Sequence, residues 1–269
     1  MYFKAKDYVT AGNALCGLAS TVVCIEAPAE DPSRYVFWAS FLIVFGWLFD
    51  ALDGVVARLT KTFNKFGSEF DNLCDHLTYG IAPAFIIYVH YRGWMPGDPV
   101  TARVLAAALA FVLPLTASIR GARFTVKPIK VPGFWIGLPR PVSAFIIVSY
   151  FNTALFGLTP LMEWAGIALV LSLGAMNLGG TAFLSHHGHV WKWYVGPILV
   201  LVAVSLGVTG LGGPILSIWG WNFLPPESFF DLMFFWLFGY MLMQWQGIPK
   251  AEWDNVRALV AAWRKAPDP

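Results

Sequence analysis

Apolar stretches long enough to cross a membrane recur along the whole of this 269-residue chain. A membrane-spanning helix needs about 20 consecutive, mostly apolar residues. Only 13% of the residues are charged, against about 25% in an average soluble domain. The sequence therefore predicts an all-α, polytopic membrane protein, a bundle of about eight transmembrane helices. The predicted spans are 8–26, 35–58, 69–91, 102–119, 141–158, 161–183, 193–212 and 227–245.

Lysine and arginine are distributed unevenly between the two sides that these spans define. Eight spans place both chain ends on one side, where fifteen basic residues fall, and only Arg34, Arg92 and Arg103 fall on the other. Because cytoplasmic connectors carry an excess of Lys and Arg, we expect both termini in the cytoplasm. The fifteen are Lys4, Lys6, Arg58, Lys61, Lys65, Arg120, Arg123, Lys127, Lys130, Arg140, Lys192, Lys250, Arg257, Arg264 and Lys265.

The rest of the composition limits the domain organisation and the partners. Residues 1–269 show no internal repeat or second domain, so we expect a single membrane domain. A formal net charge of +2 without a long basic tract argues against nucleic acid as a partner. In the tail, 249–269, apolar residues recur at helical spacing among charges. This pattern predicts an amphipathic helix, either at the membrane interface or packed against the bundle.

Four aspartates lie inside this apolar sequence, and their spacing predicts that they converge. Asp50 and Asp53 are three residues apart on one predicted helix, and Asp71 and Asp75 are four apart on the next, so each pair shares a helix face. The short polar segment 59–68 turns the chain, which predicts two antiparallel neighbouring helices. We therefore expect the four carboxylates to meet near the cytoplasmic end of the seam between them.

The chemistry of these side chains points to a cation and a phosphate. Carboxylate oxygens prefer hard cations such as Mg²⁺, Mn²⁺ or Ca²⁺. Gly54 and Ala57 lie on the same face as Asp50 and Asp53, and their small size lets a ligand or a helix approach closely. Arg58 can bind a phosphate through its planar guanidinium. Metal ions beside an arginine suit a diphosphate, and a remaining carboxylate can take a proton from an incoming hydroxyl.

Two other interpretations of the aspartates remain open. A single intramembrane aspartate is more often a proton relay or an interhelical hydrogen bond. The four together are also compatible with an ion-coupled transporter. Transporters, however, commonly repeat broken helices in two halves of the chain, whereas these acids occupy one pair of adjacent helices.

The run from Asp50 to Asp75 resembles the signature of the CDP-alcohol phosphotransferases, D-x-x-D-G-x-x-A-R-x(8)-G-x-x-x-D-x-x-x-D, at every defining position. The resemblance implies an integral membrane enzyme that cleaves a CDP-linked substrate at its diphosphate and releases CMP. It also implies that Asp50, Asp53 and Asp71 hold divalent metal, two ions of Mg²⁺ or Mn²⁺ with Ca²⁺ as an alternative. Asp75 would bind metal or serve as general base.

The same resemblance assigns roles to smaller residues. Gly54, Ala57 and Arg58 would line the CDP pocket. Gly67 would allow close approach of the substrate or of a neighbouring helix.

Further stretches, 10–17, 70–84, 119–125 and 137–141, resemble motifs of bacterial and archaeal phosphatidylserine synthases. This implies CDP-diacylglycerol and L-serine as substrates, in a prokaryotic inner or cell membrane with the active site facing the cytoplasm, and a homodimer. Asn72 and Cys74 depart from the usual Ser and Ala. The acceptor alternatives are therefore glycerol phosphate, inositol or its phosphate, and choline.

Three further residues are candidate substrate ligands. Asn13, in the first apolar stretch, would donate to the nucleotide, or else to another helix. Arg120 and Arg123 would clamp the acceptor's carboxylate or a lipid phosphate, or else anchor the helix end at the cytoplasmic surface. His186, His187 and His189 form a histidine cluster, for which headgroup contact or solvation is expected rather than metal binding.

Overall fold

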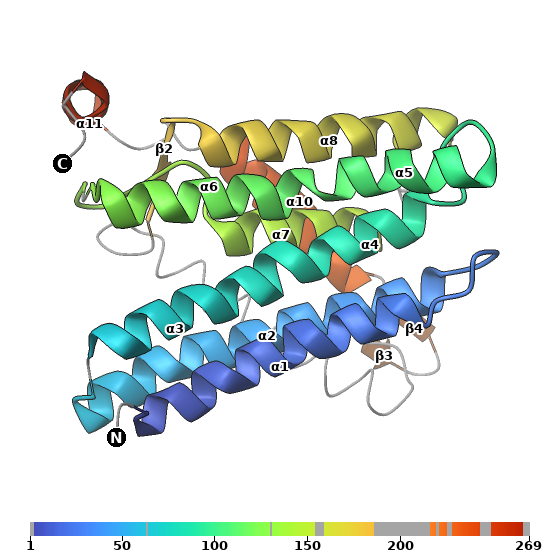
Figure 1. Ribbon diagram of the computed structural model, residues 1–269, viewed down its shortest axis with the longest axis horizontal. Helices are drawn as coiled ribbons and strands as arrows, with labels where there is room; N and C mark the ends of the chain where they lie inside the picture. Colours follow the sequence, from blue (N-terminus) through green and yellow to red (C-terminus); the bar gives the residue numbers. More distant parts are fainter. Residues whose placement is uncertain are drawn as a thin grey trace.

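The computed structural model describes residues 3–62, 64–129, 131–153, 159–185, 216–218, 221–224, 228–242 and 249–265. Most of these residues are helical (Figure 1). The helices are α1 (Ala5–Ile25), α2 (Ser33–Thr60), α3 (Lys65–His76), the π-helical turn η1 (Leu77–Ile81), α4 (Ala82–Tyr91), α5 (Pro99–Ala110), α6 (Val112–Val126), α7 (Arg140–Tyr150), α8 (Pro160–Leu178), α10 (Ser228–Leu242) and α11 (Lys250–Lys265). The strands are β1 (Phe134–Ile136), β2 (Ala182–Leu184), β3 (Leu216–Ile218) and β4 (Trp221–Leu224).

Among the described residues, four helical segments are long and apolar enough to span a membrane. They are α1, α2, the α5–α6 pair taken as one segment (Pro99–Val126) and α8. The predicted membrane helix bundle is confirmed at this level. The count of eight spans and the side on which the termini lie stay predictions, and the predicted span 193–212 falls outside the described residues.

Prolines explain where two of the long helices are interrupted. A proline inside a helix lacks an amide hydrogen and clashes with the carbonyl four residues earlier. Pro83 follows the wide turn η1, which separates α3 from α4, and Pro114 follows the break at Phe111 between α5 and α6. The predicted span 69–91 is therefore α3, η1 and α4 in succession, and its irregular turn buries Thr78 and Tyr79.

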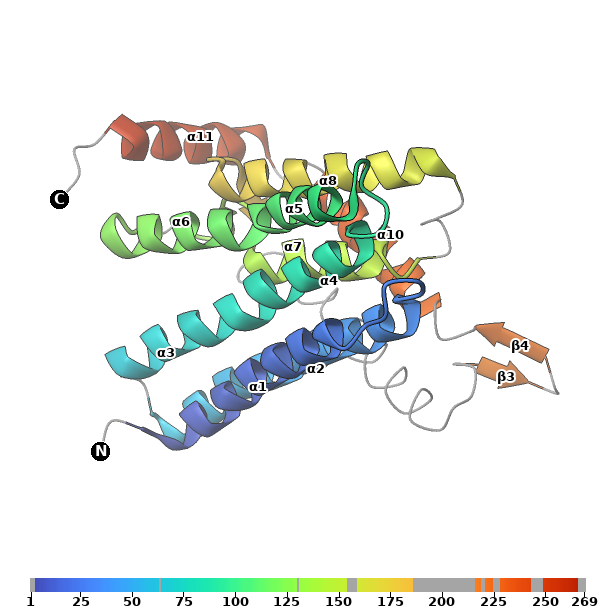
Figure 2. The same cartoon turned by 45° about the vertical axis from the view of Figure 1, so that its right-hand side comes forward.

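The first helices form one layer of the bundle, and the later helices lie over them (Figures 1 and 2). α1 packs lengthwise on α2 and crosses η1. At that crossing a Cβ on Gly17 would lie 2.7 Å from the Cα of Thr78, so only glycine permits this approach. One end of the molecule holds the beginning of α1, the end of α2, the beginning of α3, the end of α6 and α11 (Figure 1).

The described fold is mainly helical, with two short antiparallel strand pairs that the all-α prediction did not include. β1 pairs with β2, with Trp135 opposite Phe183, and β3 pairs with β4. Pairing satisfies backbone groups of connectors that cannot continue a helix. The β1–β2 pair also forms a second, smaller apolar cluster with α11. The predicted amphipathic tail is thus a helix that packs on the rest of the protein.

Candidate metal centre

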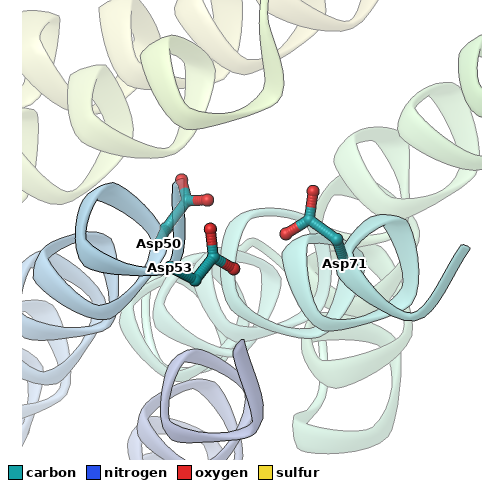
Figure 3. A group of neighbouring side chains, drawn as sticks. All are labelled: Asp50, Asp53 and Asp71. Atoms are coloured by element: carbon teal, nitrogen blue, oxygen red, sulfur yellow. The ribbon is translucent and has the colours of Figure 1, made fainter. Parts of the chain in front are cut away.

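Three of the four predicted aspartates meet at one point (Figure 3). Asp50 and Asp53 come from α2 and Asp71 from α3, and one carboxylate oxygen of each lies within 4.8 Å of the other two. Asp53 is buried, and Asp50 and Asp71 are half-buried. The sequence prediction that these side chains converge is confirmed for these three residues.

A short turn brings α2 and α3 to the same end of the protein. α2 ends at Thr60, because the next residue, Lys61, has a left-handed φ of 52° that stops the helix. Asn64 then caps α3, because its Oδ1 accepts a hydrogen bond of 2.6 Å from the Gly67 amide. A side-chain cap of this kind satisfies an amide that the first helical turn leaves free.

The helix α1 packs against both aspartate-bearing helices, which the sequence did not predict. A Cβ on Gly12 would lie 2.6 Å from Cδ1 of Phe49 on α2, and a Cβ on Gly67 of α3 would lie 2.5 Å from Cε of Lys6. The carboxylates therefore face one another beside α1 and not across a seam formed by α2 and α3 alone. Of the two expectations for Gly67, the structure shows the close approach of a neighbouring helix.

Hydrogen-bond donors from other helices orient two of the three carboxylates. The hydroxyl of Tyr79, in η1, donates to Oδ2 of Asp50 at 3.2 Å. The hydroxyl of Thr10, on α1, donates a short hydrogen bond to Oδ2 of Asp53. Oδ1 of Asp71 is buried and has no hydrogen-bond partner among the described residues.

These observations fit a divalent cation. Three ionised carboxylates so close together repel one another, and a cation between them removes that repulsion. The buried, unpartnered oxygen of Asp71 is a ligand atom that a cation would satisfy. Oxygen-only donors are those that Mg²⁺, Mn²⁺ and Ca²⁺ prefer.

Asp75 lies outside this group of three and has partners of its own. Nδ2 of Asn13 donates to its Oδ1 at 3.1 Å. On its other side, Nη2 of Arg140 is 3.8 Å from Oδ2. Asp75 therefore lies between a neutral donor on α1 and a cation on α7, beside the group of three carboxylates.

Arg140, which the sequence analysis counted only among the basic residues of the cytoplasmic side, lies beside Asp75 in the structure. Its Nη2 donates to Oδ1 of Asn72 at 2.9 Å and its Nη1 to the Asn72 carbonyl at 3.1 Å. Asn72 is one of the positions that depart from the related motif. The departure therefore has a structural consequence, because it holds Arg140 beside Asp75.

The remaining residues of the signature on α2 differ in how crowded and how exposed they are. Among the described residues, and apart from the backbone of its own helix, a Cβ on Gly54 would meet within 4 Å only Nη1 of Arg58, at 3.5 Å, so this face of α2 is uncrowded. Ala57 is buried and Arg58 is exposed. Sequence reasoning missed Lys6 and Asp7, which form a buried ion pair of 3.5 Å within electrostatic range of Asp53. The signal was available, since charged residues inside an apolar helix are rare.

The two arginines predicted as substrate ligands have other partners. Nη2 of Arg120 donates to the Ile136 carbonyl at 3.2 Å. Nη1 of Arg123 donates to the Leu178 carbonyl at 2.8 Å, and its guanidinium lies 5.4 Å from the ring centroid of Trp263. Within the described part of the chain, neither contacts the aspartates. The histidine cluster at 186, 187 and 189 lies outside the described residues.

Comparison with known proteins agrees with this geometry. Residues 5–176, which run from α1 to α8, match the family model for CDP-alcohol phosphatidyltransferase. The chain belongs to the CDP-alcohol phosphatidyltransferase family. All four aspartates, with Asn13, Tyr79 and Arg140, lie within the matched region, whereas α10 and α11 lie beyond it.

Several relatives carry the name CDP-diacylglycerol–serine O-phosphatidyltransferase. The protein from Methanocaldococcus jannaschii is 34% identical over 145 residues, 54% of this chain and 58% of that protein. The one from Helicobacter pylori is 38% identical over 118 residues, 43% of this chain and 47% of that protein. The one from Saccharomyces cerevisiae is 33% identical over 150 residues, 53% of this chain and 51% of that protein. The chain thus spans about half the length of the curated relatives that it matches.

Proposed function

We propose that this protein transfers the phosphatidyl group of CDP-diacylglycerol to the hydroxyl of L-serine and releases CMP. The observation that carries the proposal is the meeting of Asp50, Asp53 and Asp71, with carboxylate oxygens within 4.8 Å of one another. These residues belong to the family's signature. The choice of serine is supported by the names of the relatives.

The three carboxylates would hold divalent metal, and we expect two ions of Mg²⁺ or Mn²⁺. When bound, such ions supply positive charge to the diphosphate and align the attacking and leaving oxygens. The uncrowded face at Gly54 leaves room for the nucleotide, and the exposed Arg58 beside it supplies a guanidinium for a phosphate.

Asp75 would act as the general base of the transfer. The serine oxygen forms a bond to the phosphorus that carries diacylglycerol, and the serine hydroxyl proton passes to Oδ2 of Asp75. The bond between that phosphorus and the oxygen of CMP breaks, and CMP leaves with the bonding electrons. Asn13 holds the other oxygen of Asp75 in place, so that Oδ2 stays directed towards the acceptor.

Arg140 would bind the carboxylate of serine. Its guanidinium is held by Asn72 at 2.9 Å and lies 3.8 Å from the proposed base, so an acid group bound there brings a neighbouring hydroxyl to Asp75. A planar guanidinium binds a carboxylate through two parallel hydrogen bonds. The same cation would also suit the phosphate of glycerol phosphate or inositol phosphate, so these two alcohols are the competing acceptors.

An acceptor panel tests this proposal. Purified protein is supplied with labelled CDP-diacylglycerol, Mg²⁺ or Mn²⁺, and one of serine, glycerol phosphate, inositol, inositol phosphate or choline. We expect CMP release that depends on serine and stops when the metal is chelated. Turnover with another alcohol and not with serine would reject serine as acceptor. Absence of CMP release with every acceptor would reject the transferase function.

We further propose an integral protein of a prokaryotic inner or cell membrane, with its active site at the cytoplasmic face. The aspartates lie on the part of α2 and α3 near the end of the molecule where α1 begins and α11 lies. That end carries Lys4, Lys61 and Lys65, as a cytoplasmic face should. A homodimer remains an expectation from the resemblance. Because the family is one of transferases, the transporter alternative is not carried further.

A further inference from the structure

The helix α11, beyond the region that the family model matches, lies across the end of α6. It is seen end-on in Figure 1, where α6 runs across the picture, and lengthwise in Figure 2. Its buried Val256 and Val260 pack on the β1–β2 pair. Near its end, the ring of Trp263 stacks on that of Phe124, with centroids 6.2 Å apart, and its Nε1 donates to the Lys127 carbonyl at 3.2 Å. These contacts hold the end of α11 against the end of α6.

The two helix ends enclose a groove of about 440 Å³. Its lining combines small and apolar residues with three cations, as follows: Ala122, Arg123, Val126, Lys127, Trp263 and Arg264. The guanidinium of Arg123 and the ammonium of Lys127 lie 5.4 and 5.8 Å from the ring centroid of Trp263. The groove is therefore an aromatic surface surrounded by positive charge.

Two of the three cations of this groove, Arg123 and Arg264, have no anionic partner in the part of the chain that the structure describes. Among the described residues, neither Arg123 nor Arg264 forms an ion pair, and the buried Nε of Arg123 has no hydrogen-bond partner. Asp254, also on α11, pairs with Arg257 at 3.8 Å, and ten residues of helix, about 15 Å, separate it from Arg264. The ends of α6 and α11 favour cations, but a helix dipole amounts to only about half a charge.

The position of the groove restricts what can neutralise it. α6 is the end of the apolar segment Pro99–Val126, one of those long enough to span a membrane. The groove begins where that segment ends, which is the depth of the lipid headgroups. Tryptophan is enriched at this depth, and the exposed Val126 adjoins the region of the acyl chains.

We propose that this groove binds the headgroup phosphate of an anionic phospholipid, at a site separate from the aspartates. The guanidinium groups of Arg123 and Arg264 bind the phosphate, Lys127 adds its charge, and Trp263 covers the glycerol end of the lipid. Arg123 thereby contacts a lipid phosphate and not the acceptor. The proposal does not depend on which alcohol the enzyme uses.

The test compares two variants of the purified full chain in neutral detergent. One carries Lys127→Gln and Arg264→Gln together. The control carries Arg257→Gln, which removes a charge from the same helix at a side chain that is 76% exposed, outside the groove. Phosphatidylglycerol should raise the Tm of the wild type and of the control. The double variant should require about tenfold more lipid or greater for the same rise.

Lipid and phosphate controls make the outcome decisive. Phosphatidylcholine with the same acyl chains, and inorganic phosphate, should each give little protection. Equal protection by phosphatidylcholine would show that charge is not recognised, and equal protection by inorganic phosphate would show that the site is not one for lipid. Either result, or an equal response of the double variant and the control, overturns the proposal.

A second measurement uses the unaltered protein, so it holds even if the double variant folds poorly. Phosphatidylglycerol with a photoactivatable group in its headgroup is crosslinked to the wild type, and the attached peptides are mapped by mass spectrometry. We expect labelling of peptides that contain residues 122–127 or 263–264. Labelling confined to the aspartate-bearing helices would overturn the proposal, because the lipid would then occupy only the metal centre.

Discussion

Asn13 on α1 donates a hydrogen bond of 3.1 Å to Asp75 on α3, across 62 positions of the sequence. The side chain of Asn13 is fully buried, so this donor cannot be replaced by solvent. A second contact joins α1 to η1, the turn that follows α3, because the Thr78 hydroxyl donates to the carbonyl of the same Asn13 at 2.8 Å. The helix α1 therefore supplies a hydrogen-bond donor to the candidate site.

Replacing Asn13 by alanine should lower kcat by about 10- to 100-fold, as loss of an orienting partner commonly does. The KM for CDP-diacylglycerol should change little, since Asn13 holds the base. Asn177→Ala is the matched control, because Asn177 is also buried and hydrogen-bonded but contacts Ser143 and Thr116. A similar fall in kcat in both variants would show that Asn13 acts only through stability.

Asp71→Asn should reduce CMP release by at least about 1,000-fold with little loss of fold, because charge is removed and volume is kept. It should also abolish the rise in Tm that Mg²⁺ or Mn²⁺ produces in the wild type. At a metal concentration 100 times the Kd, bound metal adds about 2.7 kcal/mol to the free energy of unfolding. Asp254→Asn, on α11, is the control. Metal-dependent stabilisation that persists without Asp71 would remove it from the metal centre.

Asp75→Asn should separate chemistry from binding. Because Asp75 lies outside the group of three carboxylates, the variant should keep metal-dependent stabilisation and bind CDP-lipid. Its kcat should fall by about 10²- to 10⁴-fold, the usual contribution of a general base. Thermal shift with metal and equilibrium binding of labelled lipid measure the two effects. If metal binding is lost together with turnover, Asp75 is a ligand and the assignment as base is wrong.

Arg140→Ala should raise the KM for serine by about tenfold or more while the KM for CDP-diacylglycerol stays within about twofold, since a charged hydrogen bond is worth roughly 1.5–3 kcal/mol. Arg140→Lys should recover little, because an ammonium cannot form the paired contact. Arg123→Ala is the control and should leave the serine KM unchanged. The opposite result for the two arginines would return the acceptor clamp to Arg123.

Gly17→Ala should destabilise the protein by about 1–3 kcal/mol, because the added Cβ would overlap the backbone of η1. Gly121→Ala, on α6, has nothing within 4 Å of its added Cβ and should be neutral or slightly stabilising, as alanine favours helix by about 1 kcal/mol. Tm measurements on both variants test this. Equal Tm values would show that α1 and η1 adjust to the extra methyl group.

Local spacing accounts for what could be predicted about the site. Asp50 and Asp53 share a face because a helix repeats every 3.6 residues, and the polar turn after Thr60 returns the chain beside them. The same reasoning treated Asp71 and Asp75 as equivalent. The structure separates them, because Asp71 lies with the α2 carboxylates, whereas Asp75 accepts a hydrogen bond from Asn13 and lies beside Arg140.

The sequence by itself determined the membrane character of the chain, its mainly helical fold and the signature residues, since hydropathy and helical period depend only on neighbours along the chain. Only the tertiary structure decided that Thr10, Asn13 and Tyr79 orient the carboxylates, that Arg140 reaches Asp75 and that α11 closes a cationic groove. The physical reason is that these contacts join residues dozens of positions apart. They depend on how closely whole helices pack, which is set by glycines such as Gly17 and Gly67 and not by any local pattern.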